Sequence, residues 1–183
     1  CFERADAKAR PGIVAVLVGG TIVAVKFGPS HIEVGVEAPD FQATNLSSGK
    51  LVSLREEYRG SVTLVNIWAT WCEPCKKEIP ALDSLYRALA PEGFRLVAVS
   101  VDTDAPEKVK AFMDGFNVAF DVLHDRERKI EQTYQTTGVP ESFLLDREGR
   151  IQRIVYADHP WASAANQRII RQLLAVPAPA GSQ

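Results

Sequence analysis

The segment Val62–Leu89, "VTLVNIWATWCEPCKKEIPALDSLYRAL", constrains the fold more than any other part of the chain. Its start, "VTLVNIW", is almost wholly apolar and predicts a buried strand. Apolar residues then recur at helical spacing up to a stop at Pro91–Gly93. A buried strand that leads directly into an amphipathic helix is typical of α/β proteins. The helical residues are Ile79, Leu82, Leu85, Tyr86 and Leu89.

The rest of the chain alternates strands and helices in the same way. "FQATNLSSGKLVSL" predicts a hairpin with its turn at Asn45–Gly49, and "RLVAVSV" predicts a second buried strand. "SFLLD" and "RIQRIVY" predict another hairpin across Asp146–Gly149. We therefore expect an α/β fold, with a mixed central sheet flanked by helices, an N-terminal hairpin and a central insert. Three further helices are expected: one opened by Pro106 with Val109, Phe112, Met113 and Phe116, one with Ile130 and Tyr134, and one with Ile169, Ile170, Leu173 and Leu174.

Composition narrows the function classes. The chain has 183 residues, 46% of them hydrophobic and 24% charged, which suits one compact domain with short appendages. Its net charge of -2 argues against nucleic acid as a partner, because such a partner requires a concentrated basic face. The three cysteines are too few for a disulfide scaffold, so the pair Cys72 and Cys75 indicates chemistry.

The N-terminal region resembles a targeting segment. Ile13–Val25 is apolar apart from two glycines and a threonine, with basic residues before it and acidic residues after it. This charge order is typical of a signal peptide or a signal anchor, although the run is shorter than the roughly 20 residues that cross a membrane. No Ala-x-Ala cleavage sequence follows, which favours an anchor that is retained. The alternative is a β-hairpin around Gly19 and Gly20.

We accordingly expect residues 1–35 to form a membrane anchor or signal segment with a linker, residues 36–176 a domain, and residues 177–183 a disordered tail. Cys1 precedes the apolar run instead of following it, so it does not occupy the place of a lipidated cysteine. It is interpreted as a bystander thiol.

Cys72 is placed for nucleophilic chemistry. It stands where the buried strand ends and the helix begins, and the N–H groups and partial positive charge of a helix N-terminus favour a thiolate. A thiolate attacks disulfides, and Cys75, one helical turn later, can resolve the mixed disulfide that results. Pro74 stiffens the turn between them. Lys76 and Lys77 add positive charge and Glu73 opposes it, so these charges alone do not determine the redox direction.

Other roles for a Cys-x-x-Cys pair fit less well. A zinc site needs a second ligand pair, and only Cys1 and scattered histidines are available. Covalent haem attachment needs a histidine immediately after the second cysteine, where this chain has Lys76. Two inert core cysteines are an alternative, but the junction of a strand and a helix is a poor place to hide a thiol.

The second functional element is "TTGVPESFLLD". Val139-Pro140 directly precedes a strand, and a cis peptide bond there would bring the backbone against a neighbouring site. Alone, such a proline is more often an ordinary trans residue. Together with the Cys-x-x-Cys helix it indicates a cis-proline.

Residues from about Val36 to Leu174 resemble the thioredoxin-like proteins of the TlpA/ResA type, close also to the CcmG/DsbE group. The resemblance rests on "APDF", "NIWATWCEPCKKEIP", the inserted segment Asp102–Tyr134 and "GVPESFLLDREGRI". It implies a thioredoxin fold with Cys72 as the exposed nucleophile, Cys75 as the resolving thiol and Pro140 in cis. It also implies that Trp71, Val139 and Pro140 contact the client protein.

The resemblance raises a question about proton transfer, because thioredoxins carry a buried aspartate where this strand has Asn66. Two carboxylates are candidates for the missing acceptor. Glu78 matches the acidic residue of the ResA-type motif, and Glu141 matches the glutamate of the Pro-Glu-Thr-Phe element of CcmG-like proteins. Burial near the thiols would raise their pKa values toward the range of a proton acceptor, whereas a solvated helix glutamate is the alternative for Glu78.

The family implies an enzyme tethered by an N-terminal anchor, with its catalytic domain on the periplasmic or extracytoplasmic side of the cytoplasmic membrane. Such proteins keep protein thiols reduced, commonly the haem-binding cysteines of apocytochrome c, and are themselves reduced again by a membrane thiol donor of the CcdA/DsbD kind. No cofactor and no metal site are expected. This chain departs from the CcmG pattern at Gln135-Thr136, where a Gly-Val pair is usual.

Three alternatives to a reductase are considered. The same dithiol could donate its disulfide as an oxidase, since the direction depends on the reduction potential. The two thiolates could hold Cu(I) in a metallochaperone, although Met113 is the only methionine available as an additional soft ligand. A peroxidase is disfavoured, because Ala69 occupies the place of the threonine in the Pro-x-x-x-Thr-x-x-Cys signature. In "ADHPW", His159 and Trp161 either shape a client groove or form a helix-entry cap with a core aromatic.

Overall fold

The computed structural model describes residues 12–18, 21–27 and 31–178, and the chain divides into two compact units, Cys1–His31 and Ile32–Gln183. In the first unit, β1 (Gly12–Val18) pairs antiparallel with β2 (Thr21–Phe27), as in the hairpin alternative for this segment. Within the described ranges, no helix has the length and apolar character needed to cross a membrane. Cys1 and residues 179–183 lie outside the described residues, so the expectations for them stay predictions.

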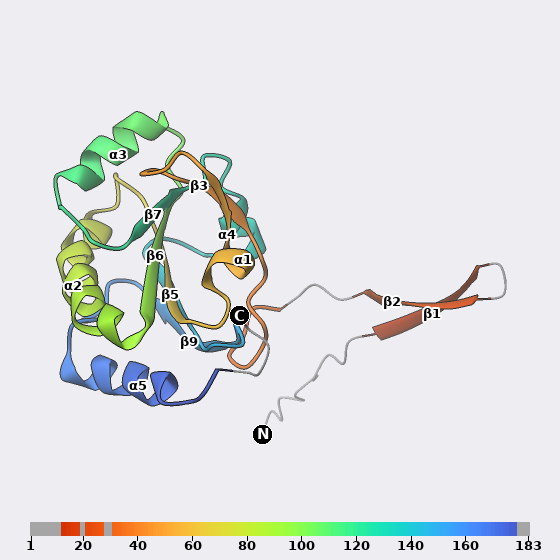
Figure 1. The fold of residues 1–183 in the computed structure, drawn as a ribbon. Helices are drawn as coiled ribbons and strands as arrows, with labels where there is room; N and C mark the ends of the chain where they lie inside the picture. The colour runs from red at the N-terminus through yellow and green to blue at the C-terminus, as the bar shows by residue number, and fades with distance from the viewer. Residues whose placement is uncertain (1–11, 19–20, 28–30, 179–183) are drawn as a thin grey trace, which may run out of the picture. The chain divides into compact units, whose positions relative to one another are not determined.

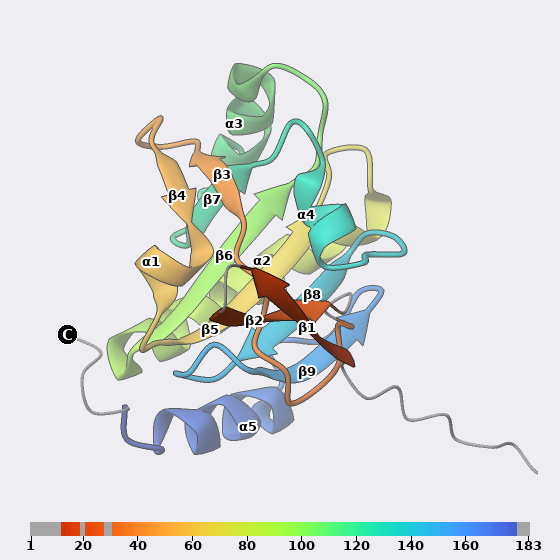
Figure 2. The same ribbon diagram turned by 90° about the vertical axis from the view of Figure 1, so that its right-hand side faces the viewer.

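The second unit is built on a mixed sheet with the strand order β4-β3-β7-β6-β5-β8-β9 (Figures 1 and 2). The neighbours β5, β6 and β7 run parallel, and all other pairs are antiparallel. The strands are β3 (Gln42–Asn45), β4 (Leu51–Ser53), β5 (Val62–Trp68), β6 (Phe94–Ser100), β7 (Asp121–His124), β8 (Glu141–Leu145) and β9 (Ile151–Tyr156).

Helices cover both faces of this sheet. In Figure 1 the sheet is seen nearly edge-on, with α2 (Glu73–Leu89), α3 (Pro106–Asp114) and α5 (Ala164–Leu174) on one side. The short helices α1 (Leu54–Tyr58) and α4 (Lys129–Thr133) lie on the other side. This three-layer arrangement is the expected thioredoxin-like fold.

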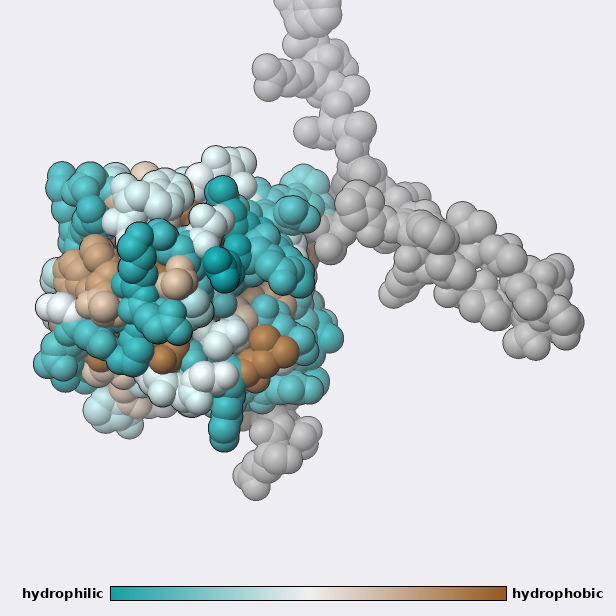
Figure 3. All heavy atoms as spheres, turned by 90° about the horizontal axis from the view of Figure 1, so that it is seen from above, coloured by the Kyte–Doolittle hydropathy of each residue, from teal (hydrophilic) through white to brown (hydrophobic). Residues whose placement is uncertain are grey.

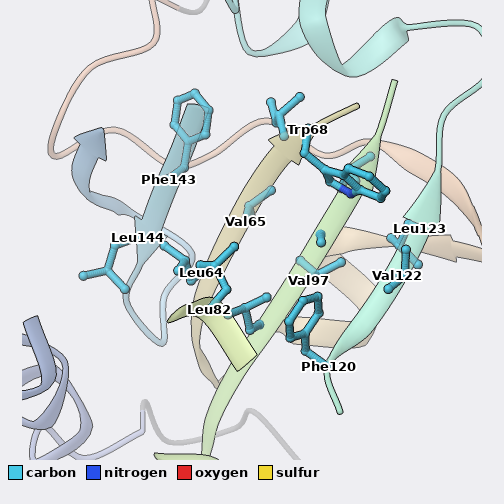
Figure 4. Packing of buried hydrophobic residues seen from close by; sticks show 14 of the residues in the cluster. Leu64, Val65, Trp68, Leu82, Val97, Phe120, Val122, Leu123, Phe143 and Leu144 are labelled. Carbon is cyan, nitrogen blue, oxygen red and sulfur yellow. The ribbon is translucent and has the colours of Figure 1, made fainter. Parts of the chain in front are cut away.

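The central strand β5 is buried along its whole length, because both of its faces are covered. Side chains alternate between the faces, so Leu64 and Trp68 point toward α2 and α3, where Trp68 stacks on Phe112. On the opposite face, Phe143 of β8 packs edge-on against Tyr134, with ring centroids 4.8 Å apart. Figure 4 shows Phe143 and Leu144 leaving β8 on opposite sides.

The strands and helices expected from periodicity are confirmed, and helix α2 is followed by a 3₁₀ turn (Ala90–Glu92) and by Gly93 in the left-handed conformation. Two helix ends were placed too late in the chain. Tyr134 was expected on the helix with Ile130, but it is the C-cap of α4, which ends at Thr133. Phe116 was expected on the helix opened by Pro106, but α3 ends at Asp114, with Gly115 as its C-cap and Asn117 in the left-handed region at φ 49°. Two elements were missed, the helix α1 and the strand β7.

Candidate active site

Cys72 is the N-cap residue of α2, so it lies where the unpaired N–H groups of the helix converge. Its Sγ accepts a hydrogen bond from the backbone N–H of Cys75 at 3.2 Å. The two cysteines form a disulfide with a Cα–Cα distance of 5.3 Å. The pair is therefore in its oxidised, disulfide form at the start of a helix, with Pro74 in the first turn.

The cis-proline predicted from "TTGVPESFLLD" is present: the Val139-Pro140 peptide bond is cis. It places the carbonyl oxygen of Val139 3.5 Å from Cys72 Sγ. Both cysteines are buried, with Cys72 5% and Cys75 1% exposed, so the expectation of an exposed Cys72 is wrong for this disulfide form; the neighbouring Trp71 is 60% exposed. The redox pair thus lies just below the surface, between an exposed indole and a backbone edge. In Figure 3, the face seen from above carries only small, separate hydrophobic patches among hydrophilic residues.

Two of the charges at the start of α2 compensate each other. Lys76 forms an ion pair with Glu73 one turn away, and its ammonium lies 5.9 Å from the centre of the Phe112 ring. Hydrogen bonding to Lys76 also lowers the pKa of Glu73. The lysine therefore does not act as a free positive charge beside the sulfur of Cys72.

Glu78 is buried on the inner face of α2, only 3% exposed, so the solvated-glutamate alternative is wrong. Its Oε2 accepts from Asn66 Nδ2 at 3.4 Å, and the same amide nitrogen donates to Ser142 Oγ at 2.9 Å. Its Oε1 accepts from the backbone N–H of His159 at 3.2 Å. Asn66, at the position of the thioredoxin aspartate, therefore serves as a donor to a carboxyl that comes from the helix.

Burial raises the pKa of the Glu78 carboxyl from 4.5 to about 7, and the nearby Asp158 also raises it. The indole N–H of Trp161 offsets this effect most, although it lies outside hydrogen-bond geometry, and the hydrogen bonds from His159 and Asn66 follow; together they offset burial only in part. A carboxyl group with this pKa exchanges its proton near neutral pH, which suits a proton acceptor in thiol chemistry.

Glu141, the second candidate, is also buried at 2% exposure, but it lies on the other face of the sheet. The register explains this position: Ser142 pairs with Asn66 and shares its face, and Glu141 precedes Ser142 on the strand. The carboxylate accepts from the backbone N–H of Thr137 at 3.3 Å. Burial raises its pKa to about 7, so the two acidic groups titrate in the same range from opposite faces.

With this geometry in place, comparison with known proteins is informative. Residues 34–154 match the model of the AhpC/TSA family. The thiol-disulfide oxidoreductase ResA of Bacillus subtilis is 35% identical over 150 residues, which cover 80% of this chain and 82% of that protein. ResA of Bacillus cereus is 34% identical over 140 residues, covering 76% and 79%. The chain belongs to the ResA-type thiol-disulfide oxidoreductases of the AhpC/TSA family.

Solved structures agree with this assignment. A crystal structure named for a thiol:disulfide interchange protein DsbE from Chlorobium tepidum has a TM-score of 0.71 and 28% sequence identity, covering 79% of this chain and 99% of that one. The fold and the Cys72–Cys75 disulfide identify this ResA-type chain as an enzyme of thiol-disulfide exchange.

Sequence reasoning missed one buried carboxylate of this ResA-type site, Asp102. It is 1% exposed and accepts from the backbone N–H of Thr70 at 2.9 Å, from the Thr70 hydroxyl at 2.6 Å and from Ser100 Oγ at 2.7 Å. It therefore anchors the loop two residues before Cys72. The signal was available, because an aspartate directly after the apolar run "RLVAVSV" lies at the end of a parallel strand.

Trp161 is 1% exposed and lies beside Glu78, so it is a core aromatic and not part of a client groove. In the part of the chain that the structure describes, no group of three or more His, Cys, Asp or Glu side chains is arranged to hold a metal ion.

Proposed function

We propose that this enzyme is a protein-disulfide reductase acting through the Cys72–Cys75 dithiol. The Cys72 thiolate attacks one sulfur of a client disulfide, that disulfide breaks, and the first client thiolate leaves. Cys75 then attacks the Cys72 sulfur of the mixed disulfide and releases the second client thiolate. Two electrons pass to the client, and the enzyme is left with the disulfide seen in the structure.

The carboxyl groups manage the protons of this exchange. Glu78, one helical turn after Cys75, accepts the proton of the resolving thiol, in place of the aspartate that Asn66 replaces. Glu141 exchanges protons at the strand edge next to Pro140, where the backbone of a client protein would lie. Trp71, Val139 and Pro140 form the surface that contacts the client, with Trp71 supplying exposed apolar area.

The reducing direction rests on one observation: buried carboxyl groups follow Cys75 and Pro140 closely in the sequence, and Lys76, the cation next to Cys75, is held in an ion pair. Lys76 is paired with Glu73, and the Val139 carbonyl oxygen faces Cys72 Sγ. These features oppose the stabilisation that the helix N-terminus gives to the Cys72 thiolate, which makes the dithiol form less favourable, so the protein passes its electrons on and takes the disulfide.

The order of charges in the N-terminal sequence supports a proposal for the cellular setting. We propose that residues 1–35 hold the enzyme at the cytoplasmic membrane with its catalytic domain on the periplasmic or extracytoplasmic side, as the basic, apolar, acidic order favours. A membrane thiol donor of the CcdA/DsbD type would restore the dithiol. The client class would be the haem-binding cysteines of apocytochrome c.

Exchange with a peptide that carries an oxidised Cys-x-x-Cys-His sequence tests this proposal in both directions. Each reduced enzyme molecule should reduce one peptide disulfide. The Cys75→Ser variant should stop at a mixed disulfide with the peptide, and the Cys72→Ser variant should neither reduce the peptide nor form a mixed disulfide. If oxidised enzyme instead converts the reduced peptide to its disulfide and equilibrium lies there, the enzyme is an oxidase and the proposed direction is wrong.

A further inference from the structure

The loop Ala157–Trp161, "ADHPW", joins β9 to α5 and contacts two parts of the active site. The backbone N–H of Ala157 donates to the carbonyl oxygen of Pro140 at 3.0 Å. Two residues later, the backbone N–H of His159 donates to Glu78 Oε1 at 3.2 Å. One short loop thus bonds both to the cis-proline and to the buried carboxyl group.

Asn166 of α5 holds this loop in place. The residue is 4% exposed, and its Nδ2 donates to the carbonyl oxygen of Pro160 at 2.8 Å. Its Oδ1 accepts from His159 Nε2 at 3.2 Å and from Arg153 Nη1 at 3.0 Å. Because an amide oxygen only accepts, Nε2 of His159 carries the proton. The amide therefore joins the loop, β9 and α5 at one buried point.

Trp161 closes the loop over Glu78. Its ring packs edge-on against the His159 ring, with centroids 4.8 Å apart, and the side chain is 1% exposed. Its Nε1 is buried without a hydrogen-bond partner, although it is close enough to Glu78 to stabilise the charged carboxylate. A buried donor left unpaired is costly, so this N–H is available to the carboxylate when Glu78 ionises.

We propose that the Ala157–Trp161 loop is a positioning element of the thiol exchange: held by Asn166, it keeps water from the Glu78 carboxyl and ties that group to the backbone of Pro140. The inference rests on the proposed role of Glu78 as the proton acceptor. The remaining groups that face Glu78 are neutral on β5 and β8, namely Asn66 and Ser142, while the loop contributes the charge of Asp158. Arg153 of β9 is directed at Asn166.

The loop has opposing effects on Glu78. It excludes solvent, which disfavours the carboxylate, and it supplies the N–H groups of Trp161 and His159, which favour the carboxylate. Burial as a whole is the largest influence on the pKa of Glu78, so we expect the solvent exclusion by the loop to outweigh its N–H groups. Releasing the loop admits water to the carboxyl and makes it a stronger acid. Glu78, the acceptor of the Cys75 proton, would then have a lower pKa, so proton transfer would respond to pH in a lower range.

Titration of the Glu78 side-chain carboxyl by NMR in the full oxidised chain tests the loop directly. In Asn166→Ala the pKa of Glu78 should fall from about 7 by about one unit or more toward its ordinary range. His159→Ala keeps the backbone N–H that donates to Glu78 and should also lower the pKa of Glu78. This second variant tests the proposal if Asn166→Ala does not fold. The control is Arg168→Ala, an exposed position on the same helix, which should leave the pKa unchanged. An unchanged Glu78 pKa in the folded loop variants would overturn the proposal.

A second readout separates this inference from the proposed function. The pH profile of peptide reduction should move to lower pH in Asn166→Ala and stay in place in Arg168→Ala. If Glu78→Gln reduces the peptide at the wild-type rate at every pH, Glu78 is not the proton acceptor, and the functional assignment fails. The NMR titration still reports whether the loop controls the carboxyl, so the two failures are distinguishable.

Discussion

Replacing Glu78 by glutamine should make folding stability respond differently to pH, because this buried carboxyl is costly to ionise. Its pKa rises from 4.5 in the ordinary state to about 7 in the folded protein. At about 1.4 kcal/mol per pKa unit, the ionised group disfavours the folded state by about 3 kcal/mol. Because the folded pKa is raised, the native protein carries its full stability below pH 4.5 and loses this part as the pH rises to about 7.

Glutamine cannot ionise, so Glu78→Gln avoids that loss. Its amide N–H₂ must face one of the two donors that now point at the carboxylate, from Asn66 or His159, and this constant cost applies at every pH. The informative quantity is therefore the change in the effect of the mutation between pH 4 and pH 8. It should favour the variant at pH 8 by about 3 kcal/mol, and the contribution of Glu141 cancels because both proteins contain it.

Guanidinium unfolding of the oxidised wild type and variant at both pH values measures this difference. A pH-dependent difference below about 1 kcal/mol would mean that the pKa of Glu78 is close to ordinary. The role assigned to burial would then be refuted, and with it the argument that this carboxyl is prepared to exchange a proton near neutrality.

Three further predictions concern the dithiol, its loop and the core. Cys75→Ser should accumulate mixed disulfides with client proteins on non-reducing gels, while Cys75→Ser combined with Cys72→Ser should accumulate none; adducts in the double variant would assign the attack to another thiol. Asp102→Ala removes the acceptor of one buried donor, Ser100 Oγ, and of two half-buried donors of Thr70, and should lower the free energy of unfolding by about 1–3 kcal/mol; exposed Asp104→Ala is the control, and equal stability of the two variants in denaturant would contradict the anchoring role. Phe143→Ala, at 0% exposure, should cost about 3–5 kcal/mol and lower the melting temperature of the oxidised protein, and a cost below 1 kcal/mol would show that its packing matters little.

Most of the fold could be predicted from the sequence, because its strands and longer helices carry strong local patterns. The run "VTLVNIW" is apolar enough to require cover on both faces, and α2 repeats its apolar residues at helical spacing. The strand β7 was not predicted because it has only four residues and shows no alternation of apolar and polar side chains. It is defined by pairing with β6 on one side and β3 on the other, which is a tertiary condition.

The site was predictable in its residues more than in its environment. Cys72, Cys75 and the cis peptide bond before Pro140 follow from local motifs. The burial of Glu78 depends on a loop 80 residues further along the chain, which no pattern near Glu78 could reveal. Similarly, the separation of Glu141 from Glu78 onto opposite faces is a consequence of strand register. The place of Asp102 at the end of a strand could be read from the sequence, but its bond to Thr70 could not.

The reduction potential of the Cys72–Cys75 pair tests the central claim most directly. Equilibration of the protein with glutathione mixtures, with Cys72→Ser as the blank, should give a potential below the glutathione couple, more negative than about −250 mV. The pair would then hold electrons at a level suited to reducing protein disulfides. A potential near the DsbA value of about −120 mV would contradict the account, since the same residues would then donate a disulfide to their clients.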